Sequence, residues 1–246
     1  MSRHRARWRG SALLADPTLC DGCGRCVPYC PVGALSLSGA GLCVDRDRCV
    51  ECGTCTRPGT CPQGALQPEQ LPWSRLLRAR FSNPLIKHPD TGVWGRGTTE
   101  MKTADVSDRV PVGQVAFAIE VGRPGISASL ADVELVATSL AGRVRFVQRN
   151  PVTHLIDPAT GRLRDSEVGA ERVLSAIVEF TAPEEALLDV LACLRDVAGR
   201  TDTVFSVCVI CRCDGGEVPL RQVLTDSGHA PRPNGKVNVG LGRPLA

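Results

Sequence analysis

The most informative stretch of the chain reads Cys20-Asp-Gly-Cys23-Gly-Arg-Cys26-Val-Pro-Tyr-Cys30-Pro31, and a related stretch reads Cys49-Val-Glu-Cys52-Gly-Thr-Cys55, closed by Cys61-Pro62. The first has the spacing C-x2-C-x2-C-x3-C-P, and the second has two additional residues before its last cysteine. Three closely spaced cysteines can bind one face of a cubic iron–sulfur core from a single loop, while a remote fourth cysteine closes the site. The two stretches therefore predict two [4Fe–4S] sites rather than a disulfide module or a zinc ribbon.

The two stretches belong to an internal repeat over residues 17–68. Asp16 precedes the first cysteine of one copy by four positions, and Asp45 does so in the other. After its Cys-Pro pair, each copy continues into a Gly-Ala-Leu turn that ends at Leu35 or Leu66. A duplication of this kind predicts two pseudo-symmetric halves, each with a short strand, a cluster loop and a short helix.

This repeat resembles the dicluster bacterial ferredoxins over residues 12–70. In that family the fourth cysteine of each run ligates the cluster of the other run. The resemblance implies that one cluster is held by Cys20, Cys23, Cys26 and Cys61 and the other by Cys49, Cys52, Cys55 and Cys30. The longer segment between Cys55 and Cys61 is compatible with this, because the fourth ligand lies outside the tight loop. It is expected to change the potential or the solvent access of a cluster.

Composition excludes several classes of function. The chain has 246 residues, 43% hydrophobic and 22% charged, which is typical of a soluble globular protein. A formal net charge of +3 is too small to indicate nucleic-acid or membrane binding, and no run of about 18 apolar residues exists for a membrane span. Thirteen cysteines without a secretory signal favour metal ligation over disulfides, so we expect a reducing cytoplasm. The basic arm over residues 1–11 is either solvated and disordered or a docking segment for an acidic redox partner.

Residues 71–111 are predicted to form an ordered loop or linker. An amphipathic stretch at 71–81 is followed by a long segment without periodicity, which is usually functional or disordered in a folded domain. Its polar residues could bind an anionic or carboxylate-bearing ligand, or latch the loop onto the next domain or a partner protein. These candidate substrate or partner contacts are Arg96, Thr98, Thr99, Glu100, Lys102 and Asp105.

Residues 112–246 have the pattern of an α+β domain. Strands are expected over 112–121, 143–148, 173–180 and 203–210, and helices over 130–140 and 183–198. The resulting β-α-β-β-α-β order predicts a ferredoxin-like sandwich, with a further helix near 218–227. The expected fold class is thus α+β, a dicluster ferredoxin domain followed by this sandwich, whose name describes topology and not cluster binding.

The remaining cysteines are expected to be free thiols. Cys43, in a strand-like segment, is interpreted as a buried apolar thiol, since eight ligands already fill two clusters. Cys193, Cys208, Cys211 and Cys213 have a different spacing. The alternatives are that these cysteines, with His229, bind zinc or a third cluster, or that two of them form a redox pair. No nucleophile–base constellation is evident, so no catalytic residue is predicted.

A second resemblance concerns two motifs, Arg96-Gly-Thr-Thr-Glu-Met-Lys-Thr-Ala-Asp105 and Arg232-Pro-Asn-Gly-Lys-Val-Asn-Val-Gly-Leu-Gly-Arg-Pro244. They look like the N-terminal part of 6-hydroxynicotinate reductase-type proteins. Those enzymes are iron–sulfur reductases, thought to use a flavin as well, that deliver ferredoxin-level electrons to an N-heteroaromatic carboxylic acid. This chain is shorter and has no flavin motif, so the resemblance implies that the substrate-reducing part is missing or lies on another polypeptide.

We therefore expect an electron-transfer protein or subunit that passes low-potential electrons through two [4Fe–4S] clusters to a partner reductase. The alternative is a self-contained iron–sulfur or flavoreductase of a heteroaromatic carboxylic acid, whose pocket would combine the 96–105 loop with residues 234–236. A third possibility is a structural or regulatory cluster protein. Electron transfer as a component of an oxidoreductase is favoured over a stand-alone enzyme, because the clusters are the only redox cofactor that a motif supports.

Overall fold

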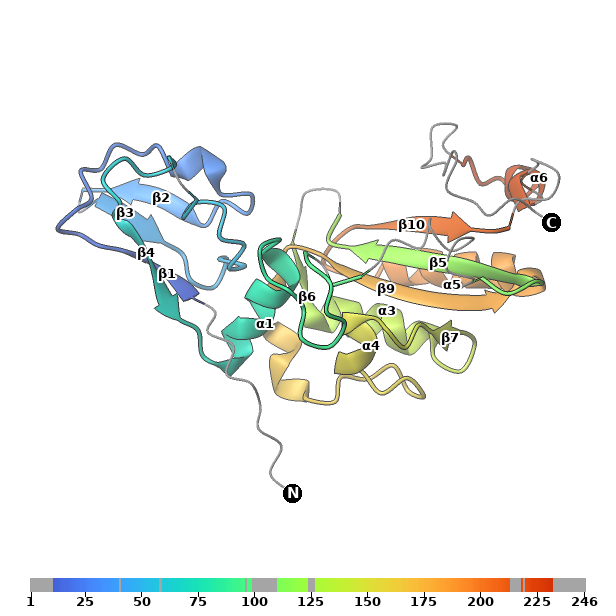
Figure 1. Ribbon diagram of the computed structural model, residues 1–246. Coiled ribbons are helices and arrows are strands. Elements are labelled where there is room, and N and C mark those ends of the chain that lie inside the picture. The colour runs from blue at the N-terminus through green and yellow to red at the C-terminus, as the bar shows by residue number, and fades with distance from the viewer. Residues whose placement is uncertain are drawn as a thin grey trace, which may run out of the picture.

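Two antiparallel strand pairs frame the N-terminal unit (Figure 1). The computed structural model describes residues 11–39, 41–57, 59–95, 97–98, 110–123, 127–212, 218 and 220–231. Strand β1 (Ser11–Ala15) pairs with β4 (Leu66–Gln70), and β2 (Leu35–Ser38) pairs with β3 (Gly41–Val44). Between the strands run the two cysteine loops, so the strands act as a small frame for them.

The two halves of the N-terminal unit close onto each other. The backbone N–H of Asp16 donates to the carbonyl of Ala65 over 2.8 Å, and that of Asp45 donates to the carbonyl of Ala34, also over 2.8 Å. Each half therefore begins against the end of the other half, as expected for a duplicated unit. A short 3-10 helix, η1 (Val27–Tyr29), follows the first cysteine loop. The described part of the second loop contains no helix, because its longer segment runs through turns instead.

Helix α1 (Trp73–Ser82) connects the N-terminal unit to the C-terminal unit (Figure 1). Its amphipathic pattern places Leu77 and Phe81 in the main hydrophobic core of the C-terminal unit, and the helix contacts β8 (Arg172–Val173). The amphipathic stretch within the expected linker is thus a helix whose residues from Leu76 to Ser82 are buried, except for the partly buried Arg80. The described residues that follow it, 83–95 and 97–98, form turns and an isolated bridge between Lys87 and Trp94.

The C-terminal unit is built on a four-stranded antiparallel sheet in the order β10-β5-β9-β7. Its strands are β5 (Gln114–Val121), β7 (Arg145–Phe146), β9 (Ala176–Pro183) and β10 (Phe205–Ile210). Helices α3 (Leu130–Leu140) and α5 (Leu187–Ala198) contribute to the same core as the sheet. Phe117 and Phe180 pair across β5 and β9 with stacked rings 4.9 Å apart, at the centre of that core.

Several short elements complete the C-terminal unit. They are β6 (Ala128–Ser129), α4 (Pro151–Leu155), the 3-10 helices η3 (Ser166–Ala170) and η4 (Glu184–Ala186), and α6 (Leu220–Asp226). The strand expected over 143–148 is only Arg145–Phe146. Helix α4 begins further along, at Pro151, where the Asn150 side chain accepts a hydrogen bond from the backbone N–H of Val152 and caps the helix. No helix in the described ranges is long and apolar enough to span a membrane.

Candidate iron–sulfur sites

The first candidate site gathers four cysteines from both halves of the repeat. A pocket that is partly open to solvent is lined by Cys20, Cys23, Cys26 and Cys61. The first three come from one loop, and the fourth comes from the end of the other. Leucine side chains form the apolar part of the wall: Leu37, Leu42 and Leu66.

Glycine and a carboxylate shape the first loop. Gly22 and Gly24 both have a φ of 70°, in the left-handed region that favours glycine. A Cβ atom on Gly24 would lie 2.9 Å from Cδ1 of Leu37, so the missing side chain lets the loop approach that wall. Asp21 accepts hydrogen bonds from the backbone N–H of Cys23 (3.1 Å) and from Nε2 of Gln63 (3.2 Å), which ties the loop to the segment that carries Cys61.

The second candidate site gathers Cys49, Cys52, Cys55 and Cys30. Burial raises the pKa of the Cys55 thiol to about 12, and negative charge on Cys52, Cys49 and Cys30 acts in the same direction. In the first site, burial likewise raises the pKa of the Cys26 thiol, with the same contribution from Cys61, Cys20 and Cys23. The thiols within each set of four are therefore close enough to influence one another's pKa. Such thiols resist ionisation on their own, and positively charged iron supplies what they need to become thiolates.

The two remote cysteines have equivalent surroundings. Sγ of Cys30 accepts a hydrogen bond from the backbone N–H of Ala34 over 3.1 Å, and Sγ of Cys61 accepts one from Ala65 over 3.3 Å. Between donor and acceptor, the Pro-x-Gly segment turns the chain back onto the sulfur. Hydrogen bonds to cysteine sulfur are among the factors that set the potential of an iron–sulfur cluster.

The donor chemistry fits a cubane better than a single ion. In the described part of the chain, no group of three or more Cys, His, Asp or Glu side chains is arranged to hold one metal ion. A [4Fe–4S] cluster binds each cysteine to a different iron atom, so its four thiolates stand farther apart than the ligands of a zinc ion. Four thiols around a partly apolar pocket are the arrangement that such a cluster requires.

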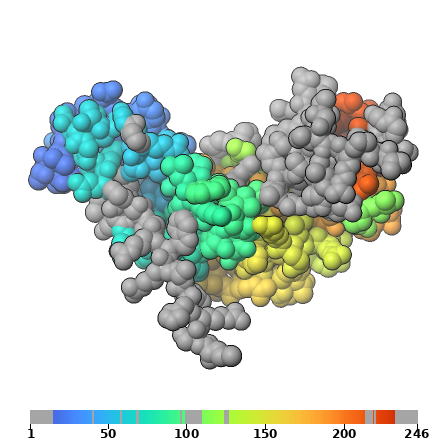
Figure 2. All heavy atoms as spheres, in the orientation of Figure 1, coloured from blue at the N-terminus to red at the C-terminus, as the bar shows by residue number. Residues whose placement is uncertain are grey.

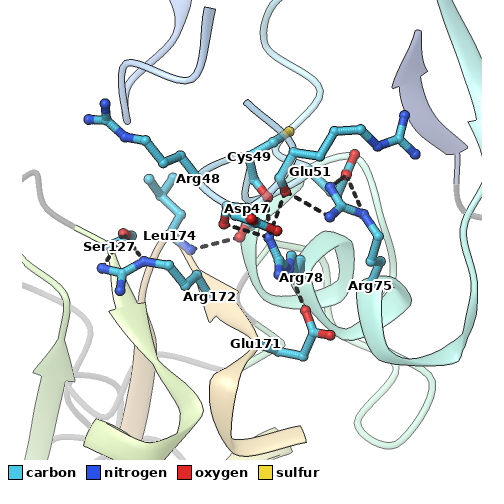
Figure 3. A network of polar contacts seen from close by, with 12 residues as sticks. Asp47, Arg48, Cys49, Glu51, Arg75, Arg78, Ser127, Glu171, Arg172 and Leu174 are labelled. Carbon is cyan, nitrogen blue, oxygen red and sulfur yellow. Dashed lines mark hydrogen bonds and ion pairs between the residues drawn. The ribbon is translucent and has the colours of Figure 1, made fainter. Parts of the chain in front are cut away.

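The two sites differ in exposure and in their neighbours. Cys23 of the first loop is exposed, whereas Cys52, at the equivalent position of the second loop, is buried. Beside Cys52, Glu51 forms an ion pair with Arg75 of α1 (Figure 3). Arg78, one turn further along α1, donates from Nη1 to the carbonyl of Cys49 over 2.9 Å. No sequence motif singles out these three residues, although Glu51 stands where the first loop has Gly22.

The 96–105 loop lies almost entirely outside the described residues. Of its candidate contact residues, Thr98 is described and is partly buried. The other five, Arg96, Thr99, Glu100, Lys102 and Asp105, lie outside the described residues, as does the whole of the 232–244 motif.

The prediction that Cys43 is buried was wrong. Cys43 is exposed, and its Sγ donates to Oγ of Ser38 over 3.2 Å. The reason is the register of the β2–β3 hairpin, in which Cys43 pairs with Ser36 on a small two-stranded sheet that leaves one face in solvent.

The late cysteines are spread over two elements. Cys208 is exposed on β10, and Cys211 follows the strand and is partly buried. Cys193 of α5 donates from Sγ to the carbonyl of Ser139 over 3.3 Å. His229 lies beside Arg195, with 3.3 Å between Nε2 and Nη2. Cys213 lies outside the described residues, and the described residues of this set form no metal site.

Comparison with known proteins gives one family match. The family of 4Fe-4S binding domains matches residues 14–36, a stretch that contains the entire first cysteine run. The match indicates 4Fe–4S cluster binding by this segment. No curated protein and no solved structure shows significant similarity to the chain. The match supports an iron–sulfur electron-transfer role.

Proposed function

We propose that the chain is an electron-transfer protein or subunit with two [4Fe–4S] clusters in a dicluster ferredoxin domain at residues 12–70, and that it passes low-potential electrons to a partner reductase. The observation that carries the proposal is that the cysteines of the first site come from both cysteine runs. Cys61, which ends the second run, lines the same pocket as Cys20, Cys23 and Cys26. This crossing is what two linked cluster sites in one duplicated module require.

The chain's own residues perform three tasks in this proposal. When bound, a [4Fe–4S] cluster accepts or releases one electron with little change in geometry. Four cysteines hold each cluster, and the N–H groups of Ala34 and Ala65 stabilise negative charge on the remote sulfurs. The leucines around the first site keep water from part of the pocket.

The surroundings of the first site favour contact with a redox partner protein. Leu19, next to Cys20, and Leu37, which lines the pocket, are large apolar side chains of this region, and they are 43% and 49% exposed. Transient redox complexes use small interfaces, and an apolar patch beside an exposed site is suited to one. We propose that the partner reductase docks here.

The C-terminal unit is proposed to be a ferredoxin-like βαββαβ sandwich over residues 112–246. Its elements follow the order β5, α3, β7, β9, α5, β10, and the sheet order β10-β5-β9-β7 places the first and third strands at the centre. Residues 71–111 connect the two units through α1.

The crossed ligation is tested by single replacements. In Cys61→Ala protein, we expect loss of the cluster held by the first loop, because its fourth ligand is gone. The residual electron paramagnetic resonance (EPR) spectrum should then match that of Cys20→Ala protein and differ from that of Cys49→Ala protein. Cys43→Ala, which removes an exposed cysteine outside both sites, should leave both clusters in place. A Cys61→Ala spectrum that matches Cys49→Ala would refute the crossed assignment.

A further inference from the structure

Glu51 occupies an unfavourable position in three respects. It is the one non-glycine residue with a positive φ in the described part of the chain, at 56°. It is only 5% exposed, and it lies in the second loop between Cys49 and Cys52. The equivalent residue of the first loop is Gly22, which adopts the same left-handed backbone without a side chain. A left-handed conformation strains a residue with a Cβ, and burial of a carboxylate adds to this cost.

The contacts of Glu51 hold its carboxylate in place. Oε1 of Glu51 accepts from Nε of Arg75 over 3.1 Å, and Nη1 of Arg75 donates to the carbonyl of Arg46 over 2.7 Å. Arg75 thus bridges Glu51 and the carbonyl of Arg46, just before the second loop. The Glu51 carboxylate therefore stays beside that loop and does not turn into solvent (Figure 3).

Arg78 extends this network to the C-terminal unit. Its Nη1 donates to the carbonyls of Arg46 (3.1 Å), Asp47 (2.9 Å) and Cys49 (2.9 Å). On the other side, Nε of Arg78 donates to Glu171, just before β8. The described part of the first loop has no such anchor to the C-terminal unit; its own carboxylate, on Asp21, is exposed and accepts a hydrogen bond from Gln63.

We propose that Glu51 lowers the reduction potential of the second cluster site and that Arg75 is the residue that positions it to do so. The inference rests on the proposed function. Reduction adds negative charge to the site, and a fixed carboxylate in a buried loop opposes that charge with little screening by solvent. Because the first loop has glycine at this position, the effect is confined to the second site. It biases an added electron toward the first site, where the exposed Leu19 and Leu37 lie.

The test compares two carboxylates that differ in burial. Glu51→Gln keeps the size of the side chain, the strain of a Cβ at a left-handed position and an acceptor oxygen for Arg75, but it removes the charge. Asp21→Asn removes a carboxylate from the first loop, where solvent screens it. Glu51→Gly reproduces the first loop and relieves the left-handed strain, so it provides a folded variant if Glu51→Gln is unstable.

The measurement is an EPR-monitored redox titration of the purified holoprotein. We expect Glu51→Gln and Glu51→Gly to raise the potential of the second site and leave that of the first unchanged, while Asp21→Asn, beside the ligands of the first site, shifts the potential of the first site alone and by less. The potential that rises should be the one retained in Cys20→Ala protein. Unchanged potentials, or equal shifts of both, would overturn the inference. A wild-type protein without two [4Fe–4S] signals would instead overturn the proposed function.

Discussion

At the scale of single residues, His88 is a buried polar side chain in an apolar setting. It is 2% exposed, its ring contacts Phe81 edge-on at 5.4 Å, and its Nε2 has no hydrogen-bond partner among the described residues. Burial lowers the pKa of His88 from 6.5 to about 4, with Arg80 and His154 acting in the same direction and Asp90 opposing them. The folded protein therefore holds His88 neutral.

This burial predicts a pH-dependent stability. Because the folded pKa is depressed, the stabilising contribution is complete above the unfolded pKa of 6.5 and is lost as the pH falls toward 4. The free energy of unfolding should fall by up to ~3 kcal/mol across this window. In His88→Gln protein the slope should be smaller, as measured by chemical denaturation between about pH 5 and pH 7. Equal slopes of the free energy of unfolding against pH in wild-type and His88→Gln protein would contradict the assignment of this pH dependence to His88.

The cysteines and Glu51 show what the sequence could predict at this scale. The spacing of the eight cysteines indicates two cluster loops, because ligands for a cubane must recur at short intervals. Val50-Glu51, by contrast, has the composition of any loop, although Val50 is only 1% exposed. Only the backbone angle of Glu51 and the position of Arg75 reveal that this carboxylate is held in place.

At the scale of elements, α1 determines how the second loop is held. Arg78 contacts three carbonyls of that loop and Glu171 of the C-terminal unit, all within a largely buried region. Removal of one partner from a buried ion pair leaves an uncompensated charge, which is strongly destabilising. A surface pair such as Arg123–Glu120, at 3.4 Å, contributes far less.

This contrast gives a prediction for α1. Arg78→Ala should lower the free energy of unfolding by about 3–5 kcal/mol, because Glu171 and three carbonyls lose their partner. Arg123→Ala, the matched control on the surface, should lower it by less than about 1 kcal/mol. Urea denaturation of both variants measures the difference. Similar small losses would mean that α1 does not hold the second loop.

Elements with strong local signals were predicted most closely. The helix expected over 130–140 is α3, because Ser129 and Asp132 form a reciprocal capping box and Gly142 follows its end. The strand expected over 143–148 is only Arg145–Phe146. Asn150, four residues beyond this strand, donates from Nδ2 to Glu179 of β9 over 2.7 Å, and its side chain also starts α4. A pairing between residues so far apart in sequence is not visible in local periodicity.

At the scale of the whole molecule, the N-terminal unit forms one end and α1 lies between it and the four-stranded sheet (Figures 1 and 2). The second cluster loop faces α1, and the first loop contributes exposed residues such as Cys23 and Tyr29. The two halves of the repeat are therefore similar in backbone but different in surroundings. This difference is the basis for assigning partner contact to the first site and anchoring to the second.

The most direct test of this account is the cluster content of the holoprotein. Iron, sulfide and flavin should be quantified on one anaerobically purified sample, together with a low-temperature EPR spectrum of the reduced protein. Two [4Fe–4S] clusters predict about eight irons and eight sulfides per chain, no flavin, and a spectrum with the spin coupling of two neighbouring clusters. About four irons with a single uncoupled signal would contradict the central claim, because the second cysteine run would then hold no cluster.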